Sequence, residues 1–459
     1  MNRALSLAEL LQGVADRGRR VIGRVRGGDG ITASLTMQQL CERLVSSRGE
    51  VSGVAYAGAI IARWRQSDAA ARLAFLDMLL ARFGSDHAQV AAAIDAYARD
   101  PSDMSASLLH AATEPARQDL FRRINLAPGG VETLVRMRED LLARLAQRPD
   151  LAVVDRDFTH LLSSWFNRGF LTLRRIDWST PASILEKIIR YEAVHEIHNW
   201  DDLRRRLQPE DRCCYAFFHP QLPEEPLIFV EVALTRGIPS TIAEILREER
   251  PLLPAEEATT AVFYSISNCQ RGLRGISFGN FLIKQVVEDL QRDLPGLADF
   301  VTLSPVPGFA AWVGGDGADV EGAKEARAIA TTPGWIDDEA ACARMEALMP
   351  ALAARYFLLA RDDGGRVIDP VARFHLGNGA QLERINPLGD RSPRGIGTAL
   401  GLMVNYRYRP EDIETNHERY FASHEVVALP SIRSLLRRTD AKRPRRPSAR
   451  RGAMSEHKE

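Results

Sequence analysis

The stretch Ala261-Val-Phe-Tyr-Ser-Ile-Ser267 is rich in β-branched and aromatic residues and predicts a strand. It continues into Asn268-Cys-Gln-Arg-Gly-Leu-Arg-Gly-Ile-Ser-Phe-Gly-Asn280 and Phe281-Leu-Ile-Lys-Gln-Val-Val287, which predict a turn and then a helix. Gly272 and Gly275 allow the backbone to turn tightly. The free amides and the positive dipole end of the following helix would make an anion site that fits a pyrophosphate. A purely structural turn explains the two glycines equally well.

Strand-like and helical segments alternate on both sides of this stretch, which predicts an α/β or α+β domain over residues 178–436. The strand-like runs are Cys214–Phe218, Leu227–Leu234, Ala261–Ser267 and Phe300–Leu303, and the helical stripes are Thr241–Arg247, Phe278–Leu290 and Glu339–Met349.

Residues 1–177 have the pattern of an all-helical domain, because apolar residues recur at spacings of three and four. One such stripe consists of Leu73, Leu76, Leu79, Leu80 and Phe83. No cluster of catalytic residue types accompanies the stripes, so we interpret this part as a helical bundle for packing or oligomerisation.

Residues 437–459 are basic and include Lys442-Arg-Pro-Arg-Arg-Pro447, which contains no core-forming residue. We expect a disordered, solvated tail, and contact with an acidic partner is the alternative.

Composition excludes several classes of protein. The chain has 459 residues, which is long for one core and predicts two domains. Lys+Arg and Asp+Glu are 60 each, so net charge points neither to nucleic acid nor to a membrane surface. No apolar run approaches the roughly 20 residues of a membrane span, and no signal peptide or peroxisomal Ser-Lys-Leu end is recognisable. We therefore expect a cytoplasmic location.

The five cysteines form no CxxC pair and have no metal-ligand spacing to a histidine. We interpret them as reduced, partly buried thiols. A bridge between subunits through the adjacent pair Cys213-Cys214 is the alternative.

A second candidate site is the end of the next strand, Thr302-Leu-Ser-Pro-Val-Pro-Gly-Phe309. Pro305 and Pro307 cannot continue a central strand, so the strand should end near Ser304 and hold its hydroxyl there. Ligands of open α/β sheets bind at such strand ends. An ordinary turn serine is the alternative.

A third candidate is His375, just before Asn378-Gly379, which is a strong signal for a two-residue hairpin. Counting back from this turn predicts that His375 lies on the incoming strand. An imidazole with an ordinary pKa of about 6.5 can carry a proton at neutral pH. A structural or exposed histidine is the alternative.

By glycine spacing, Arg394-Gly-Ile-Gly-Thr-Ala-Leu400 is also a candidate phosphate loop at the start of a helix. It competes with the turn around Gly272 and Gly275 for the same role.

Taken together, these segments resemble the malonyl-CoA decarboxylase family. The resemblance covers about residues 180–425 and is carried, in order, by His219-Pro-Gln-Leu-Pro223, Phe229-Val-Glu-Val-Ala-Leu234, Tyr264-Ser-Ile-Ser267, Gly272-Leu-Arg-Gly275, Phe281-Leu-Ile-Lys284, Leu303-Ser-Pro-Val-Pro-Gly-Phe309, Phe374-His-Leu-Gly-Asn-Gly-Ala380 and Asn405-Tyr-Arg-Tyr408.

The resemblance implies an α+β protein with an N-terminal helical bundle and a catalytic domain of the GNAT acetyltransferase fold. In that fold the CoA pyrophosphate sits on the turn after the fourth strand, which favours the earlier turn over the Arg394 loop. The implied CoA-binding residues are Arg271, Gly272, Arg274, Gly275, Ile276, Ser277, Phe278, Gly279 and Asn280. The chain departs from the pattern in two places. Ser277 stands where family members can carry a glutamate, and one extra residue separates the two glycines.

The family's catalytic positions correspond to Ser304 and His375, with Asn378, Tyr406 and Tyr408 as supporting candidates. Loss of CO2 leaves a thioester enolate, which needs hydrogen-bond donors at oxygen and a proton at carbon. His375 as imidazolium could supply that proton, while Ser304 binds the departing carboxylate or relays a proton. The thioester is the electron sink, so we expect neither a metal nor another cofactor.

The resemblance implies decarboxylation of malonyl-CoA to acetyl-CoA, by a homotetramer and within fatty-acid metabolism. That role could be malonate breakdown or control of fatty-acid synthesis. Two other functions would share the CoA site. An acyl-CoA N-acyltransferase would form product only with an added amine, and a catalytically inactive regulator would bind malonyl-CoA without turnover.

Overall fold

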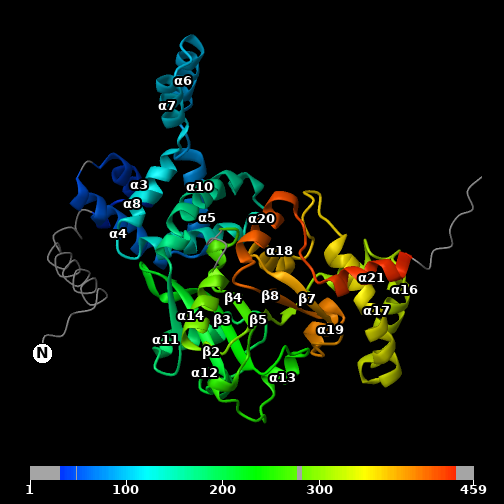
Figure 1. Ribbon diagram of the computed structural model, residues 1–459. Coiled ribbons are helices and arrows are strands. Elements are labelled where there is room, and N and C mark those ends of the chain that lie inside the picture. The colour runs from blue at the N-terminus through cyan, green and yellow to red at the C-terminus, as the bar shows by residue number, and fades with distance from the viewer. Residues whose placement is uncertain (1–31, 48, 277–281, 441–459) are drawn as a thin grey trace, which may run out of the picture. The chain divides into compact units, whose positions relative to one another are not determined.

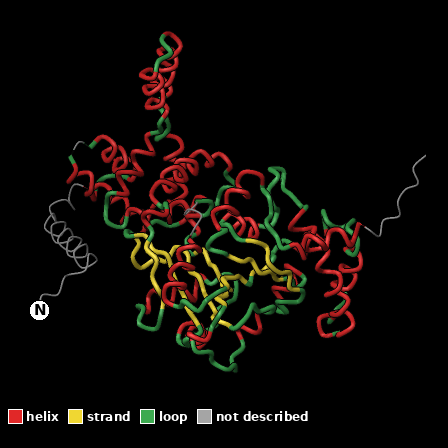
Figure 2. The backbone as a smooth tube through the Cα atoms, viewed as in Figure 1, coloured by secondary structure: helices red, strands yellow, loops and turns green. Residues whose placement is uncertain are grey.

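A computed structural model describes residues 32–47, 49–276 and 282–440, which form two compact units. Of the described residues, the first unit comprises residues 32–172, 219–225 and 270–276, and the second comprises the others. Figure 1 labels their elements along the chain, and Figure 2 distinguishes the helices from the strands, which lie between residues 172 and 408. The expected α+β organisation, helices first and a mixed sheet afterwards, is confirmed.

The described part of the first unit is helical. Its α-helices are α3 (Met37–Ser46), α4 (Glu50–Gln66), α5 (Ala69–Arg82), α6 (His87–Arg99), α7 (Asp103–Thr113), α8 (Ala116–Asn125), α9 (Gly130–Leu142) and α10 (Ala152–Trp165), with 3-10 turns at η1 (Pro149–Leu151), η2 (Arg168–Phe170) and η4 (Arg271–Leu273). Side-chain caps explain several starts, since Asp68, Asp86 and Ser102 each accept a backbone N–H of the following helix.

Apolar side chains of α3, α4, α5, α8, α9 and α10 form the core of this unit, and the predicted stripe on α5 buries Leu76 and Leu79. Helices α6 and α7 differ, because they pair with each other as a hairpin that extends from the other helices of the unit (Figure 1). Among the described side chains α6 buries none and α7 only Ser105.

The second unit is built on a mixed eight-stranded sheet of order β1-β2-β3-β4-β5-β8-β6, with β7 paired to β8. The strands are β1 (Thr172–Ile176), β2 (Arg212–His219), β3 (Leu222–Thr235), β4 (Thr260–Asn268), β5 (Asp299–Thr302), β6 (Ser304–Pro305), β7 (Gln381–Asn386) and β8 (Met403–Tyr408). Strands β4 and β5 are parallel and pair from Thr260↔Asp299 to Phe263↔Thr302. Since a parallel pair needs a crossover, α14 connects them, which is the strand–turn–helix–strand order expected from the sequence.

Helices surround this sheet. They are α11 (Ala182–Tyr191), α12 (Trp200–Leu207), α13 (Ile242–Leu246), α14 (Leu282–Asp293), α15 (Phe309–Gly314), α16 (Ala323–Ala330), α17 (Glu339–Leu358), α18 (Pro370–Gly377), α19 (Pro393–Ala399), α20 (Ile413–Ser423) and α21 (Pro430–Asp440), with 3-10 turns η3 (Ala255–Glu257) and η5 (Trp335–Asp337). The apolar sides of α11, α12 and α13 pack on strands β2 to β5 and on Met403 of β8.

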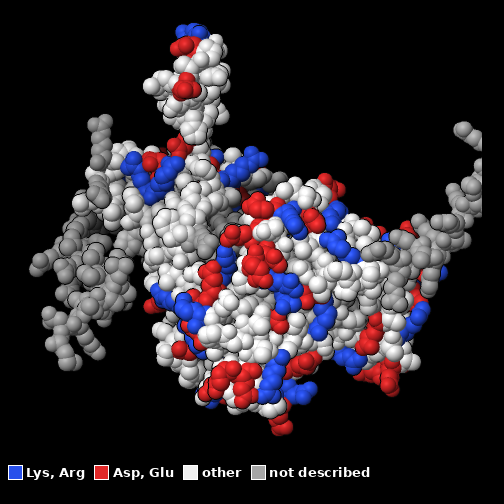
Figure 3. All heavy atoms as spheres, viewed as in Figure 1, with Lys and Arg blue, Asp and Glu red and all other residues white. Residues whose placement is uncertain are grey.

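The structure also bears on the expectations for the C-terminal tail, the cysteines and membrane-spanning helices. Helix α21 continues through Asp440, so the start of the expected disordered tail is helical, and residues 441–459 lie outside the described residues. All five cysteines are free and buried, so neither Cys213 nor Cys214 of β2 presents its sulfur for a bridge between subunits. Among the described helices none is long and apolar enough to cross a bilayer. Acidic and basic side chains are mixed on the face drawn in Figure 3, in line with the balanced composition.

Candidate active site

Ser304 and His375 are 71 residues apart in the chain but lie in hydrogen-bond contact, with 3.1 Å between Ser304 Oγ and His375 Nε2. Ser304 belongs to β6 and pairs with Val404 of β8. His375 comes from α18. Both are buried, with 5% and 3% of their surface exposed. The structure therefore brings together the two residues that the sequence singled out as catalytic candidates.

The expected strand position of His375 is wrong. Residues 370–377 form α18, whose N-cap is Asp369 and whose first residue is Pro370. Asp369 accepts the N–H of Ala372 at 2.8 Å, and its second oxygen accepts the Tyr356 hydroxyl at 3.1 Å. Asp-Pro is a strong helix start, and it outweighs the hairpin signal. Asn378-Gly379 instead ends the helix, with Gly379 at φ +82°.

Tyr408 fixes the protonation pattern of the His375 ring. The Tyr408 hydroxyl lies 2.8 Å from His375 Nδ1, and the structure describes no other hydrogen-bond partner for it. Burial holds the pKa of this phenol well above its usual range, so it keeps its proton. Because the Ser304 hydroxyl donates to Thr302, it accepts from His375 Nε2, and Nδ1 is then left to accept the Tyr408 hydroxyl.

Burial keeps His375 uncharged in the free protein. It lowers the pKa of His375 to about 3, and burial alone accounts for the shift. The expectation that this imidazole carries a proton at neutral pH is therefore wrong for the free protein. The sequence offered an ordinary pKa because it could not show that the ring is enclosed.

Two further side chains complete the polar group around Ser304. The Ser304 hydroxyl donates to Thr302 Oγ1 at 2.8 Å, and the backbone N–H of Tyr406 donates to the same oxygen at 3.1 Å. The Tyr406 ring stacks on His375, with 4.7 Å between ring centroids and 24° between planes. Its hydroxyl is buried and has no hydrogen-bond partner among the described residues. A buried hydroxyl of this kind is costly unless a ligand satisfies it.

Asn378, the remaining supporting candidate, lies at the C-terminal end of α18. Its side-chain amide donates to the carbonyl oxygen of Phe374 at 2.8 Å, so it closes the helix that carries His375. The residue is 6% exposed.

The predicted CoA turn follows β4, as expected, but its two glycines serve different needs. Gly275 has φ +79°, a conformation that favours glycine. Gly272 is needed for space, because a Cβ there would lie 1.9 Å from the carbonyl oxygen of Val135 on α9. Arg271 and Arg274 are exposed, and Ile276 is buried. Ser277, Phe278, Gly279 and Asn280 lie outside the described residues.

The competing loop at Arg394 already has one of its first amides capped by a side chain. Helix α19 begins at Pro393, and the side chain of its N-cap Ser392 accepts the N–H of Gly395 at 3.0 Å. Gly395 also packs on Asp390, where a Cβ would lie 2.5 Å from a carboxylate oxygen. A carboxylate at this position disfavours a phosphate.

Family models match most of the chain. The model described as malonyl-CoA decarboxylase C-terminal domain matches residues 169–446, and the malonyl-CoA decarboxylase N-terminal domain matches residues 83–166. The mitochondrial malonyl-CoA decarboxylase of Anser anser anser is 37% identical over 412 residues, 81% of each chain. The chain belongs to the malonyl-CoA decarboxylase family.

Solved malonyl-CoA decarboxylases have the same architecture. The crystal structure of the Rhodopseudomonas palustris protein has 54% identity and a TM-score of 0.83, covering 89% of this chain and 99% of that one. The Agrobacterium vitis protein has 58% identity and a TM-score of 0.83, covering 87% and 99%. The mitochondrial malonyl-CoA decarboxylase of Rattus norvegicus is 37% identical over 409 residues, 81% of this chain and 82% of its own.

Sequence reasoning missed some residues of this malonyl-CoA decarboxylase family member. Thr302 could have been found, since it lies two residues before Ser304 and alternate strand residues share a face. Asp369 could have been found as a helix cap, since Pro370 follows it, but nothing in the sequence indicated its contact with Tyr356. Arg138, which binds the turn at Gly272, gave no signal, because 134 residues separate them.

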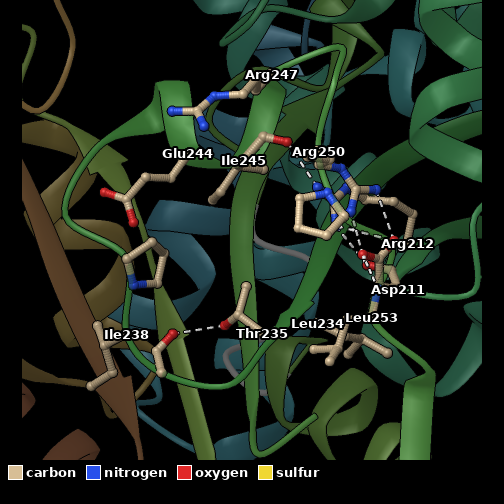
Figure 4. A pocket seen from close by; sticks show the side chains of 13 residues that line it. Asp211, Arg212, Leu234, Thr235, Ile238, Glu244, Ile245, Arg247, Arg250 and Leu253 are labelled. Atoms are coloured by element: carbon tan, nitrogen blue, oxygen red, sulfur yellow. Dashed lines mark hydrogen bonds and ion pairs between the residues drawn. The ribbon is translucent and has the colours of Figure 1, made fainter. Parts of the chain in front are cut away.

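A cavity of about 460 Å³ in the second unit is lined by other residues, among them Asp211, Arg212 and Arg250 (Figure 4). Its arginines are largely engaged: Arg250 binds the carboxylate of Asp211, and Arg212 donates to the carbonyl oxygens of Asp211 and Ile245. None of the predicted catalytic or CoA-binding residues that the structure describes lines it.

Proposed function

We propose that the protein decarboxylates malonyl-CoA to acetyl-CoA and CO2, with Ser304 and His375 at the reacting centre. The observation that carries the proposal is the buried hydrogen-bonded chain from Tyr408 through His375 to Ser304. It provides a proton donor and a hydroxyl side by side in a site where burial alone sets the pKa of the histidine.

The proton needed at the α carbon is proposed to be taken up by His375 from solvent when the substrate binds. Free His375 is neutral, but the malonyl carboxylate brings a negative charge that raises the pKa of a nearby imidazole. The ring then takes up a proton on binding. The Tyr408 hydroxyl can follow this change by rotating, because a phenol either donates to Nδ1 or accepts from it.

The bond changes then balance. The bond between the carboxylate carbon and the α carbon breaks, CO2 leaves, and the electron pair moves into the thioester carbonyl as an enolate. The Nε2 proton of His375 passes through the Ser304 hydroxyl to the α carbon, which completes the acetyl group and returns the ring to its neutral form. The thioester holds the electron pair, so the proposed reaction uses no metal and no other cofactor.

Tyr406 is proposed as a hydrogen-bond donor to the enolate oxygen. Its hydroxyl is buried without a partner among the described residues, and its ring lies against His375. A preorganised donor at an oxygen that gains charge is an effective means of lowering the barrier.

The CoA phosphates are proposed to bind at the turn after β4. Arg271 and Arg274 are exposed there, and neither has an ion pair among the described residues. Two free guanidinium groups beside a turn suit phosphate oxygens, which they can bind bidentately.

Location and assembly are proposed separately. We propose a cytoplasmic protein, supported by five free, buried cysteines that suit a reducing compartment, although the curated relatives are named mitochondrial. We propose a homotetramer assembled through the helical unit, supported by the exposed apolar side chains Ile94, Met104 and Leu108 of the α6–α7 hairpin. Cell fractionation and light scattering of the purified protein test these two points.

The reaction is tested by giving purified protein malonyl-CoA and following acetyl-CoA by mass spectrometry. Ser304→Ala and His375→Ala should each lower kcat by at least about 100-fold, because each removes a member of the proton path. Turnover that survives both changes would overturn the proposed site. Intact malonyl-CoA would point to the regulator, and product formed only with an added amine would point to the acyltransferase.

A further inference from the structure

The proposed CoA turn is attached to the helical bundle. Its residues group with the first unit, and 3-10 turn η4 lies against α9. The contact is backbone to backbone, because a Cβ on Gly272 would meet the carbonyl oxygen of Val135 at 1.9 Å. No residue larger than glycine fits without moving the turn away from α9.

Arg138 of α9 holds the turn by its carbonyl groups. One guanidinium nitrogen, Nη1, donates to the carbonyl oxygens of Gly272 and Arg274 at 2.8 Å and 2.9 Å. The other two nitrogens are held by α10, with Nε 2.8 Å from Asp155 Oδ1 and Nη2 3.2 Å from Thr159 Oγ1. The side chain is 4% exposed. Arg138 is therefore a buried side chain that connects α10 to the turn by hydrogen bonds.

The contact with Arg138 orients the turn, and with it the side chains of Arg271 and Arg274. Since Arg138 binds the carbonyls of residues 272 and 274, these point toward α9, while the Arg271 and Arg274 side chains remain exposed. Apart from the Arg138 contacts, the backbone bonds described for residues 273–276 are short-range, such as the N–H of Ile276 to the carbonyl oxygen of Leu273 at 3.0 Å. The position of the two exposed arginines thus depends on the helical unit.

We propose that Arg138 is a positioning residue for the phosphates of CoA: through it, the N-terminal helical unit sets the affinity for the nucleotide part of the substrate without taking part in the chemistry. This inference rests on the proposed binding of CoA at the turn. It gives the helical unit a role in substrate binding besides packing or assembly.

The test uses Arg138→Lys, which keeps a positive charge beside Asp155 but replaces the planar fork by a single ammonium. Its matched control is Arg117→Lys. Arg117 is another buried arginine of the same unit and binds Asp157 of α10, but it does not contact the turn. Each variant is assayed with malonyl-CoA and with malonyl-pantetheine, which has the same reacting group and lacks the CoA phosphates.

Arg138→Lys should raise KM for malonyl-CoA by about tenfold and leave kcat within about twofold, since misplaced binding groups weaken binding without changing the reacting centre. KM for malonyl-pantetheine should not change, and Arg117→Lys should change neither value. Equal effects on both substrates, or a KM for malonyl-CoA that matches the Arg117→Lys control, would overturn the proposal.

Two further measurements separate the possible failures. If Arg138→Lys does not fold, Gly272→Ala takes its place, because the added methyl must displace the turn from α9. Gly272→Ala should then raise KM for malonyl-CoA and leave KM for malonyl-pantetheine unchanged.

If the parent protein does not turn over malonyl-CoA, the decarboxylase proposal fails, and calorimetric titration with CoA decides the positioning role. Weaker CoA binding by Arg138→Lys than by the parent supports it, and equal or absent binding overturns it.

Discussion

At the residue scale, surroundings rather than residue type decide what His375 can do. The ring lies between the Ser304 and Tyr408 hydroxyls and against the Tyr406 ring. Because burial holds its pKa near 3, the free protein has a neutral ring with fixed donor and acceptor sides. Such a ring donates to Ser304 through Nε2 and becomes charged only when an anion enters the site. The proposed reaction depends on this change of state.

The first prediction concerns proton uptake. Binding of malonyl-CoA to the Ser304→Ala variant at pH 7 should take up about one proton, because the carboxylate raises the pKa of the neutral His375 ring. Calorimetry in buffers of different ionisation enthalpy measures it. Acetyl-CoA lacks the carboxylate and should take up none. Equal uptake with both ligands would mean that His375 is not the group that is protonated.

The second prediction concerns Tyr408. Tyr408→Phe removes the only described partner of His375 Nδ1, which frees the ring to change tautomer and orientation. We expect kcat to fall by about 10- to 100-fold with little change in KM, as when a histidine loses the group that orients it. Steady-state kinetics measure the change. Tyr215→Phe, on β2 and without a described contact to His375, is the control, and an equal loss there would contradict the assignment.

At the element scale, helix α18 and strand β8 bring the reacting groups together. Strand β8 lies between β5 and β6; it pairs with Ser304 and presents Tyr406 and Tyr408 to His375. Helix α18 is one of the shorter helices, and its position depends on its ends. Asp369 caps its start and binds Tyr356, and Asn378 closes its C-terminal end. Catalysis should therefore respond to changes in these caps.

The third prediction tests that dependence. Asp369→Ala should lower the free energy of unfolding by about 2–3 kcal/mol, since a cap is lost and Tyr356 is left without its partner. It should also lower kcat, because α18 carries His375. Asp369→Asn keeps an oxygen that can accept the N–H of Ala372, and its amide nitrogen can donate to the Tyr356 hydroxyl oxygen, so it should restore much of both. Urea unfolding and steady-state kinetics measure these effects.

The control for that prediction is Asp86→Ala, which removes the N-cap of α6 in a hairpin that buries almost nothing. The cost there should be about 1 kcal/mol or less, with kcat unchanged. If Asp369→Ala behaves like this control, the cap does not position His375.

At the scale of the whole molecule, buried titratable groups link stability to pH. Burial lowers the pKa of His375 to about 3 and that of His195 to about 4. Unfolded histidines bind protons below about pH 6.5, and the folded ones do so only near their lowered pKa values. The unfolded state therefore binds more protons in this window, so both groups make stability fall as pH drops from about 6.5. Glu231, whose pKa burial raises to about 8, acts in the opposite direction between about pH 4.5 and 8.

The fourth prediction isolates His375 from these opposing effects. Between pH 7 and pH 5 the parent should lose about 2 kcal/mol more stability than His375→Gln, which cannot bind the proton in either state. Urea unfolding at the two pH values measures the difference. His87→Gln on α6 replaces an exposed histidine and should leave the pH dependence of the parent unchanged. An equal loss in parent and His375→Gln would show that the ring is not held neutral by burial.

The sequence by itself determined several secondary-structure elements and the family of this protein. Apolar spacing located the helical N-terminal part, and the run from Ala261 to Val287 indicated the strand, turn and helix that precede β5, since these patterns depend on neighbouring residues. The two prolines after Ser304 correctly marked the end of the strand region. The motifs in order were specific enough to indicate the malonyl-CoA decarboxylase family, which the family models confirm.

The tertiary structure decided the burial, the pKa and the packing contacts of those residues. The sequence placed His375 on a strand with an ordinary pKa, whereas packing encloses it on a helix and keeps it neutral. Gly272 suited a phosphate turn by pattern, but its space is limited by Val135, which is far away in the chain. Burial and long-range backbone contacts arise only when distant segments pack together. Spacing along the chain identified the candidates, and only the packed fold set their charge, their partners and the position of the turn.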